Sequence, residues 1–276
     1  MRDSNQFHYQ KSNYLDQVTL LSAQMNDFTY GKHAHEEFSI GLTMAGRQDF
    51  FANGEFHRSL PGNVMVFNPD QVHDGHSGID DTLHYRMLYI HPAQLEPMFE
   101  AAGMKNAKGF RVPELLINDA QLGKHVLRLA QLFDHDDHDE IQHECELYHL
   151  AARISQLFGA NSEQDPARRI DTLLLRAKDY MLANLDKEAS LELISQQANL
   201  SKYHFLRLFK AQFGITPHQY LINCRVNRAR ESLEKGADIN DVVYECGFSD
   251  LSHLNRRFKP CFGMTPKQYQ QLVFNS

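Results

Sequence analysis

The spacing of apolar residues changes midway along the chain. In the segment FSIGLTMAG, every second position is apolar: Phe38, Ile40, Leu42 and Met44. This alternation predicts a half-buried β-strand, because successive side chains of a strand point to opposite faces. In RRIDTLLLRAKDYMLANL, one stripe at helical spacing contains Ile170, Leu173, Leu174, Ala177, Met181 and Leu185. The first half of the chain is therefore predicted to be β-rich and the second half helical.

Turn residues divide the first half into several short strands. Asn53-Gly54 lies between two strand-like runs in RQDFFANGEFHRSL, and a type I′ hairpin turn needs the positive φ that Asn and Gly tolerate. The segments LPGNVMVFNP and LHYRMLYIHP predict two further strands. Several short strands at this spacing favour a β-sandwich or a barrel.

Two amphipathic helices are predicted after the strands, in DAQLGKHVLRLAQLF and EIQHECELYHLAARISQLF. Their apolar stripes are Leu122, Val126, Leu129 and Phe133 in the first and Leu147, Leu150, Ile154 and Leu157 in the second. Such stripes suit either core packing or a dimer contact.

A polar, proline-containing segment, FGANSEQDPARR, separates the two halves as a linker should. We therefore expect an α+β protein of two domains. Residues 1–160 form the first, residues 161–169 the linker, and residues 170–276 an all-α domain.

The helical half contains one element twice. HFLRLFKAQFGITPHQY begins at His204, and HLNRRFKPCFGMTPKQY begins 49 residues later at His253; ten of the seventeen paired positions are identical. In the first copy, Ser190 and Ser201 are predicted to cap two short helices, and Gly214 suits the left-handed position that ends the second. Helix, tight turn and helix make a helix-turn-helix unit, whose second helix can enter the major groove of DNA.

The second copy, DINDVVYECG-FSD-LSHLNRRFK, follows the same plan. Upstream of the recognition helix the offset between the copies falls from 49 to 48, so that Leu200 pairs with Phe248. One extra residue is therefore predicted in the second turn.

Repeated and divergent positions fall on opposite faces of the two recognition helices. The pairs Phe205/Leu254 and Phe209/Phe258 share one face and are predicted to be core. The other face carries Tyr203, Leu206, Arg207 and Lys210 in the first copy and Ser252, Asn255, Arg256 and Lys259 in the second. Arg favours guanine, Asn favours adenine, and Leu can contact a thymine methyl. A solvated charged face is the alternative for either helix alone.

These motifs carry a family resemblance. Residues 170–274 resemble the DNA-binding domain of the AraC/XylS family of bacterial transcription regulators, most specifically through CGFSDLSHLNRRFK and the bridging segment QYLINCRVNRARESL. The resemblance implies seven helices, with two helix-turn-helix units held by the bridging helix over successive major grooves. It places DNA contacts on Tyr203, Leu206 and Arg207 and on Ser252, His253, Asn255 and Arg256. Pro260 departs from the pattern, and we expect it to end the second recognition helix early.

The first half resembles the cupin-like sensing domain common in that family. Its markers are His33-x-His35, Gly46, the turn at Pro61-Gly62, and Pro69 before His73. Cupin enzymes use such histidines with a downstream glutamate to hold a catalytic metal. In this chain Ser39 and Ile40 stand where that glutamate is expected, and the glycine expected between Pro69 and His73 is missing.

The incomplete cupin pattern predicts a sensor rather than an enzyme. We expect His33, His35 and His73 to line a pocket for a small effector, with no catalytic residue, no bound metal and no cofactor. A purely structural hydrogen-bonding role is the alternative for these histidines. A second cluster, FDHDDHDEIQHE, places His135, His138 and His143 among acidic residues; a solvated loop between two helices is expected there, with metal binding as the alternative.

Charge separates the halves in the same way. Residues 166–276 carry 16 Lys and Arg against 11 Asp and Glu, whereas the remainder carries 12 against 24. A basic domain joined to an acidic one suggests a polyanionic partner for one half only.

The four cysteines show no CxxC pairing, the N-terminus lacks an apolar signal region, and no apolar run approaches the ~20 residues of a membrane span. A cytoplasmic protein is expected.

Together these features predict a sequence-specific regulator, an activator, that binds double-stranded DNA and responds to a small-molecule effector. A homodimer and a contact with RNA polymerase are further expectations. Two alternatives are a metal-dependent cupin enzyme with an appended helical domain, and a regulator that responds to a protein partner instead of a ligand.

Overall fold

The computed structural model describes residues 5–78, 82–134, 140–159, 172–187 and 190–274. The chain divides into two compact units, and the division falls between Glu163 and Gln164. The predicted linker, residues 161–169, and Ile170 of the predicted helical stripe lie outside the described residues. No helix within the described ranges is long and apolar enough to span a membrane.

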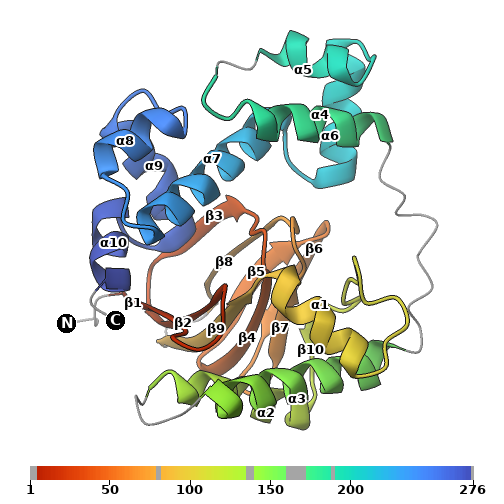
Figure 1. The fold of residues 1–276 in the computed structure, drawn as a ribbon, viewed down its shortest axis with the longest axis vertical. Helices are drawn as coiled ribbons and strands as arrows, with labels where there is room; N and C mark the ends of the chain where they lie inside the picture. The colour runs from red at the N-terminus through yellow and green to blue at the C-terminus, as the bar shows by residue number, and fades with distance from the viewer. Residues whose placement is uncertain (1–4, 79–81, 135–139, 160–171, 188–189, 275–276) are drawn as a thin grey trace. The chain divides into compact units, whose positions relative to one another are not determined.

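Two antiparallel sheets form the N-terminal unit (Figure 1). The larger sheet has the order β1-β2-β9-β4-β7-β10, made of β1 (Gln6–Lys11), β2 (Val18–Met25), β9 (Leu83–Ile90), β4 (Phe38–Ala45), β7 (Val64–Phe67) and β10 (Leu116–Ile117). The smaller sheet has the order β3-β8-β5-β6, made of β3 (Thr29–His33), β8 (His73–Ser77), β5 (Gln48–Ala52) and β6 (Glu55–Ser59). The predicted β-rich fold is confirmed, although the sequence pattern identified only about half of these strands.

The hairpin between β5 and β6 has the predicted turn. Asn53 has φ 53° and Gly54 has φ 85°, so both central residues adopt the positive φ of a type I′ turn. The turn sets the register that pairs Ala52 with Glu55 and Gln48 with Ser59.

Strand β4 differs from its prediction because both of its faces are buried. Phe38, Ile40 and Leu42 belong to the core between the larger sheet and the helices. Ser39 and Thr43, on the opposite face, are each only 1% exposed. The strand is central in a sheet that is covered on both sides, which explains why it is not half-buried; Met44, at its end, is 42% exposed.

Three helices cover the outer face of the larger sheet (Figure 1): α1 (Pro92–Ala101), α2 (Ala120–Leu132) and α3 (Glu140–Phe158). The shared core contains Leu20, Ile40, Val66 and Leu88 from the strands, Leu95 and Phe99 from α1, Leu122, Val126 and Leu129 from α2, and Leu147, Leu150 and Ile154 from α3. The two helices predicted from the sequence are confirmed, and the buried part of their stripes serves the core. Helix α1 was not predicted.

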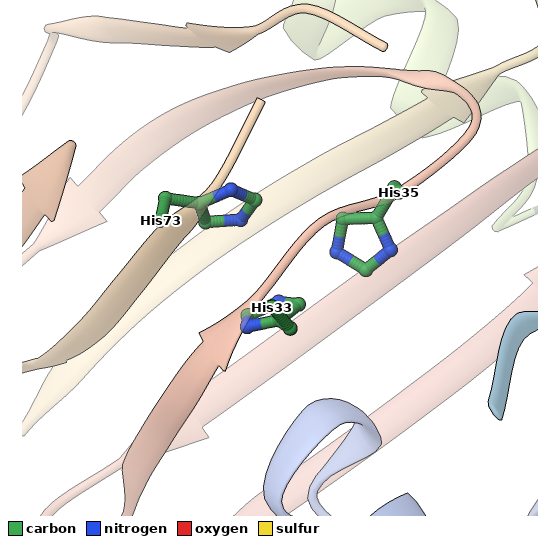
Figure 2. A group of neighbouring side chains, drawn as sticks. All are labelled: His33, His35 and His73. Atoms are coloured by element: carbon green, nitrogen blue, oxygen red, sulfur yellow. The ribbon is translucent and has the colours of Figure 1, made fainter. Parts of the chain in front are cut away.

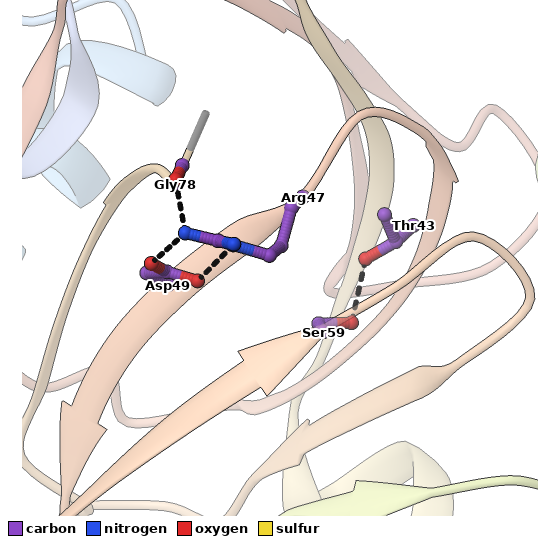
Figure 3. A network of polar contacts seen from close by, with 5 residues as sticks. All are labelled: Thr43, Arg47, Asp49, Ser59 and Gly78. Carbon is purple, nitrogen blue, oxygen red and sulfur yellow. Dashed lines mark hydrogen bonds and ion pairs between the residues drawn. The ribbon is translucent and has the colours of Figure 1, made fainter. Parts of the chain in front are cut away.

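Polar side chains connect the strands at one end of this unit (Figure 3). Thr43 Oγ1 of β4 and Ser59 Oγ of β6 lie 2.7 Å apart, in a hydrogen bond that links the two sheets. Arg47 donates two hydrogen bonds to the carboxylate of Asp49, at 2.8 and 2.9 Å, and a third to the carbonyl oxygen of Gly78. The turn between β4 and β5 is thereby tied to the end of β8.

The described residues of the C-terminal unit form seven helices, as the family resemblance implied. They are α4 (Thr172–Ala183), α5 (Leu191–Gln197), α6 (Lys202–Phe213), α7 (Pro217–Glu234), α8 (Ile239–Glu245), α9 (Leu251–Phe262) and α10 (Pro266–Phe274). The 18-residue helix α7 contacts α4 and α6 as well as α8, α9 and α10. One long helix therefore holds the α5–α6 and α8–α9 pairs together (Figure 1).

The two helix pairs repeat each other in backbone detail. Gly214 ends α6 with φ 75° and ψ −12°, and Gly263 ends α9 with φ 77° and ψ −12°. The turns contain left-handed residues 48 positions apart, Asn199 and Gly247, whereas the N-caps Ser201 and Asp250 are 49 apart. The extra residue of the second turn therefore lies between Phe248 and Asp250, at Ser249.

One prediction about the helix ends was wrong. Pro260 does not shorten α9, which has twelve residues like α6 and includes the proline. Proline removes one amide donor, but Phe258 and Phe262 on either side of it are buried, and the amide of Gly263 still bonds to the carbonyl of Lys259. Core packing and the glycine cap thus maintain the last turn. Ser201 occupies the predicted N-cap position but makes no side-chain cap hydrogen bond.

Candidate DNA-binding and ligand-binding sites

Helix α6 has a buried face that packs in the core and an opposite face that carries the predicted DNA contacts. Phe205 and Phe209 are completely buried, as their spacing predicted. Tyr203 is 86% exposed, Arg207 and Lys210 are also exposed, and Leu206 is partly exposed. The four residues predicted to contact DNA from this helix are therefore accessible to a partner.

Helix α9 repeats this division. Leu254 and Phe258 are completely buried. Ser252, Arg256 and Lys259 are exposed, whereas His253 and Asn255 are partly exposed. Arg257 is also exposed on α9 and was not among the predicted residues; its counterpart in α6 is the apolar Leu208.

The N-terminus of α9 is more firmly held than that of α6. Asp250 Oδ1 accepts a hydrogen bond from the amide of His253 at 2.7 Å, and Ser249 Oγ donates to Asp250 Oδ2 at 3.0 Å. These bonds keep the pKa of Asp250 below its usual value, with the amide of His253 the largest cause. Ser249 Oγ also lies 3.2 Å from His253 Nδ1. The extra residue of the second turn therefore helps to fix a predicted DNA-contact residue.

Arg225, on α7, was not recognised from the sequence as a site residue. Its Nε donates to the carbonyl of Leu185 and its Nη2 to the carbonyl of Lys187, both at 2.8 Å. The side chain is 9% exposed, and burial lowers its pKa. Arg225 thereby anchors the chain that leads into α5 to the bridging helix. An arginine amid the buried positions of a long helix is the signal that could have indicated it.

The three predicted pocket histidines meet between the two sheets (Figure 2). The ring centroids lie 4.5 Å apart for His33 and His73, 4.8 Å for His33 and His35, and 5.5 Å for His35 and His73. The side chains are buried, at 4%, 4% and 6% exposure. His33 and His73 are cross-strand partners of β3 and β8, next to a register irregularity in that ladder.

Two of these rings have an assigned hydrogen bond to the backbone. His33 Nδ1 lies 2.6 Å from the carbonyl oxygen of Gly31, and His73 Nδ1 lies 2.9 Å from that of Gln71. Burial lowers the pKa of His33 and lowers that of His73 well below its usual value; the neighbouring His33 lowers the latter further. Both imidazoles are therefore neutral near pH 7.

Aromatic residues that the sequence did not identify surround the three histidines. Phe67 stacks on His73 with centroids 3.8 Å apart and an interplanar angle of 3°, and Tyr89 meets His35 at 4.8 Å. The hydroxyls of Tyr30 and Tyr85 lie 2.8 Å apart, and burial raises the pKa of both phenols. The period-two spacing of Tyr85 and Tyr89 on β9 was the available signal, since it places them on one face.

The other histidine cluster is only partly described. His135 and His138 lie outside the described residues. His143 is in α3 rather than in a loop; it is 2% exposed and packs 4.8 Å from the ring of Tyr14. A different group was missed: His125 of α2 with Glu146 and His149 of α3, at the outer surface of the helices. Its ion-pair distances are 3.5 and 3.8 Å.

Comparison with known proteins agrees with this division into two units. Residues 17–151 match the model of the AraC-like ligand-binding domain, and residues 194–272 match that of a helix-turn-helix domain. Together the two models match more than half of the chain.

Relatives match along most of their length. The chain is 28% identical over 252 residues to the transcriptional activator RhaS of Escherichia coli O139:H28, covering 88% of each protein. It is 27% identical over 237 residues to the HTH-type transcriptional regulator YbfI of Bacillus subtilis, covering 82% of this chain and 81% of that protein.

The fold resembles that of ToxT from Vibrio cholerae O395, with a TM-score of 0.63 at 10% identity over 95% of this chain and 100% of that one. ToxT has also been solved with an unsaturated fatty acid bound, a structure that matches at a TM-score of 0.61 and 11% identity, covering 96% and 99% of the two chains. At this identity the likeness concerns the fold alone. Taken with the two domain matches and the relatives, the architecture leads to one conclusion: this chain belongs to the AraC family of transcription regulators, with a ligand-binding domain followed by a DNA-binding domain that contains two helix-turn-helix units.

Proposed function

We propose that this protein activates transcription by binding a specific DNA sequence through α6 and α9, under the control of a ligand bound in its N-terminal unit. The observation that carries the proposal is the repetition of one scaffold with a different exposed face on each copy. The glycine caps Gly214 and Gly263 and the buried Phe209 and Phe258 repeat, whereas the partly exposed positions Leu206 and Asn255 differ. Such a pair suits two recognition helices that read two different half-sites.

The exposed faces contain the chemistry that base reading needs. Arg207 and Arg256 occupy equivalent exposed positions, and a guanidinium can donate two hydrogen bonds to the major-groove edge of guanine. Asn255 suits adenine in the same way, and Leu206 suits a thymine methyl. Lys210 and Lys259, nearer the C-terminal ends of their helices, suit phosphate contacts, which position a protein without reading the sequence.

Ligand control is supported by the match to an AraC-like ligand-binding domain and by the buried group of His33, His35 and His73. We assign the ligand site to these three residues. The RhaS relatives are named as activators, which supports activation rather than repression. The relatives are regulators, and this supports a non-enzymatic role in the cytoplasm, where bacterial DNA and RNA polymerase are found.

A homodimer is the proposed assembly, formed through the outward face of α3. Ile141 is 68% exposed and Tyr148 is 37% exposed, and with the exposed Cys145 they follow a spacing of four and three residues along one face. These residues are separate from the buried stripe that α3 contributes to the core.

The proposal is tested by selecting bound duplexes from a random pool with the full-length protein. We expect two conserved half-sites about one helical turn apart. Affinity for the selected duplex should fall steeply as salt concentration rises, because each neutralised phosphate releases counterions. The control is the double variant Arg207→Ala/Arg256→Ala, whose side chains are exposed and whose fold should persist. A pool that remains random after selection, or binding that does not depend on salt, contradicts the proposal.

A further inference from the structure

The arrangement of the three buried histidines fits a metal ion. Each ring of His33, His35 and His73 offers a nitrogen within 4.8 Å of the nitrogens offered by the other two. Ligand nitrogens around a tetrahedral zinc ion lie roughly 3.3 Å apart, given bonds of about 2.0–2.1 Å. The three nitrogens are therefore grouped near ligating distance, and they must approach one another further to share one ion. The residues come from the end of β3, the loop after it and the start of β8 (Figure 2).

Backbone hydrogen bonds select the nitrogen that two of the rings, His33 and His73, can offer. A carbonyl oxygen only accepts hydrogen bonds, so the Nδ1 atoms of His33 and His73 carry the proton and donate to Gly31 and Gln71. In a neutral imidazole this leaves the Nε2 lone pair as the only possible metal ligand. Metal-bound histidines in proteins are held in this way, with the second ring nitrogen donating to a carbonyl or carboxylate.

The surrounding aromatic residues preorganise the site. Phe67 stacks on His73 in a parallel arrangement, and the Tyr89 ring meets that of His35 edge-on. These contacts restrict ring rotation, so less conformational entropy is lost when an ion binds. The register irregularity between Tyr30 and His33 also contributes, because a β-bulge changes the direction of the side chain that follows it.

We propose that His33, His35 and His73 bind one divalent transition-metal ion, and that this ion is the ligand through which the N-terminal unit controls DNA binding. The regulatory part rests on the proposed function, whereas the metal site stands on its own geometry. Three imidazoles suit zinc, copper, nickel or iron, and leave a further coordination position open. The missing cupin glutamate is the reason why the sequence predicts no metal, but three imidazoles in one buried group can hold an ion without that carboxylate.

Cobalt(II) is a suitable probe, since its visible absorption reports coordination geometry. The full-length protein is stripped with a chelator and titrated with Co²⁺ and then with Zn²⁺. We expect one equivalent of Co²⁺, bound with a spectrum of low coordination number and displaced by Zn²⁺. His35→Gln should weaken this binding at least 100-fold. The matched control is His149→Gln, which disrupts the group at the surface of α2 and α3 and should leave the buried equivalent intact.

A second variant separates ligation from folding. His35→Cys keeps a metal-binding side chain, so it should bind Co²⁺ and add a sulfur-to-cobalt charge-transfer band that the wild type lacks. If neither the wild type nor His35→Cys binds a stoichiometric ion, or if His149→Gln removes the only bound equivalent, the metal site is overturned.

DNA binding gives the second readout. Affinity for the selected duplex is measured by fluorescence anisotropy with the stripped protein and with one equivalent of Zn²⁺. We expect a change of at least 5-fold that is absent in His35→Gln. Bound metal with unchanged DNA affinity overturns the regulatory part alone. A protein that selects a specific DNA sequence but takes up no stoichiometric metal ion overturns this inference and leaves the proposed function standing. A protein that takes up the metal ion but selects no DNA sequence contradicts the proposed function and leaves the metal site standing.

Discussion

Phe209 and Tyr220 pack edge to face, with ring centroids 5.6 Å apart and an interplanar angle of 69°. The second copy reproduces this contact in Phe258 and Tyr269, with the same distance and the same angle. Each pair joins a recognition helix to the helix that follows it. The repeated aromatic positions therefore set the orientation of both recognition helices in the same way, and the differences between the copies are left to the exposed faces.

Replacing the repeated phenylalanine with alanine should lower the free energy of unfolding by the same amount in both copies. Phe209→Ala and Phe258→Ala each remove a completely buried ring, so each should lower the free energy of unfolding by about 3–5 kcal/mol. Denaturant unfolding of the full-length protein, followed by a probe in the C-terminal unit, measures both. A cost below about 1 kcal/mol for either variant shows that its copy is not packed as described.

A methyl group at Gly247 should disturb the turn between α8 and α9. Gly247 has φ 74°, and its added Cβ meets the carbonyl oxygen of Leu185 and lies 2.8 Å from Arg225 Cζ. Gly236→Ala is the matched control, since its φ is 84° and its Cβ meets only the ring end of the exposed Phe274. In both variants the strain of a left-handed backbone should lower the free energy of unfolding by about 1–2 kcal/mol. The clash should lower the free energy of unfolding of Gly247→Ala clearly further, as measured by thermal or denaturant unfolding. Equal losses in the two variants argue against the clash.

The two recognition arginines should each specify one half-site. Arg256→Ala should cost about 1–3 kcal/mol of DNA-binding free energy and relax the preference at one base position. Arg207→Ala should do the same about 10 base pairs away. Leu206→Ala should relax specificity less, because a thymine methyl contact lacks a directional hydrogen bond. Selection from a random pool with each variant measures this. Uniform weakening on all sequences places both arginines on phosphates instead.

The ion pair between α2 and α3 should be lost in acid. Asp119 caps α2 through the amide of Leu122, and Arg153 of α3 donates to both carboxylate oxygens, at 2.6 and 3.1 Å. The hydrogen bonds from Arg153 are the largest cause that lowers the pKa of Asp119 to about 2. Because the folded pKa lies below the unfolded value of about 3.9, the stabilisation is complete above that value and disappears as pH falls towards 2.

Asp119→Ala should therefore lower the free energy of unfolding by at least about 1 kcal/mol at pH 7, as the loss of an N-cap does. The difference from wild type should shrink between about pH 4 and pH 2. Urea unfolding at pH 7, 4 and 3 tests this. A difference that stays constant down to pH 3 shows that the carboxylate is not selectively stabilised in the folded state.

Dimer formation should depend on the outward face of α3. Ile141→Glu places a charge at a position that is 68% exposed, so the monomer should remain folded while the dimer dissociates. Leu60→Glu, at a position 53% exposed outside α3, is the matched control and should leave assembly unchanged. Sedimentation velocity compares the three proteins. Equal sedimentation of Ile141→Glu and wild type removes α3 as the interface.

The sequence alone determined the helical unit almost completely. Its caps, αL glycines and apolar stripes are local signals, and their repetition at offsets of 49 and 48 residues identified two helix-turn-helix units and their exposed faces. The sequence also determined the β5–β6 hairpin, because Asn-Gly turn chemistry involves only neighbouring residues.

Tertiary structure decided what depends on distant contacts. The burial of both faces of β4 follows from helices and a second sheet that lie elsewhere in the sequence, and buried flanking side chains with a glycine cap kept Pro260 inside α9. The alternation of apolar and polar residues along one strand cannot show whether other elements cover both of its faces. The sequence predicted that His33, His35 and His73 line one pocket, but it did not predict how closely their rings approach one another. The approach of their ring nitrogens to within 4.8 Å of one another depends on the pairing of β3 with β8, which is a property of the fold rather than of any local pattern.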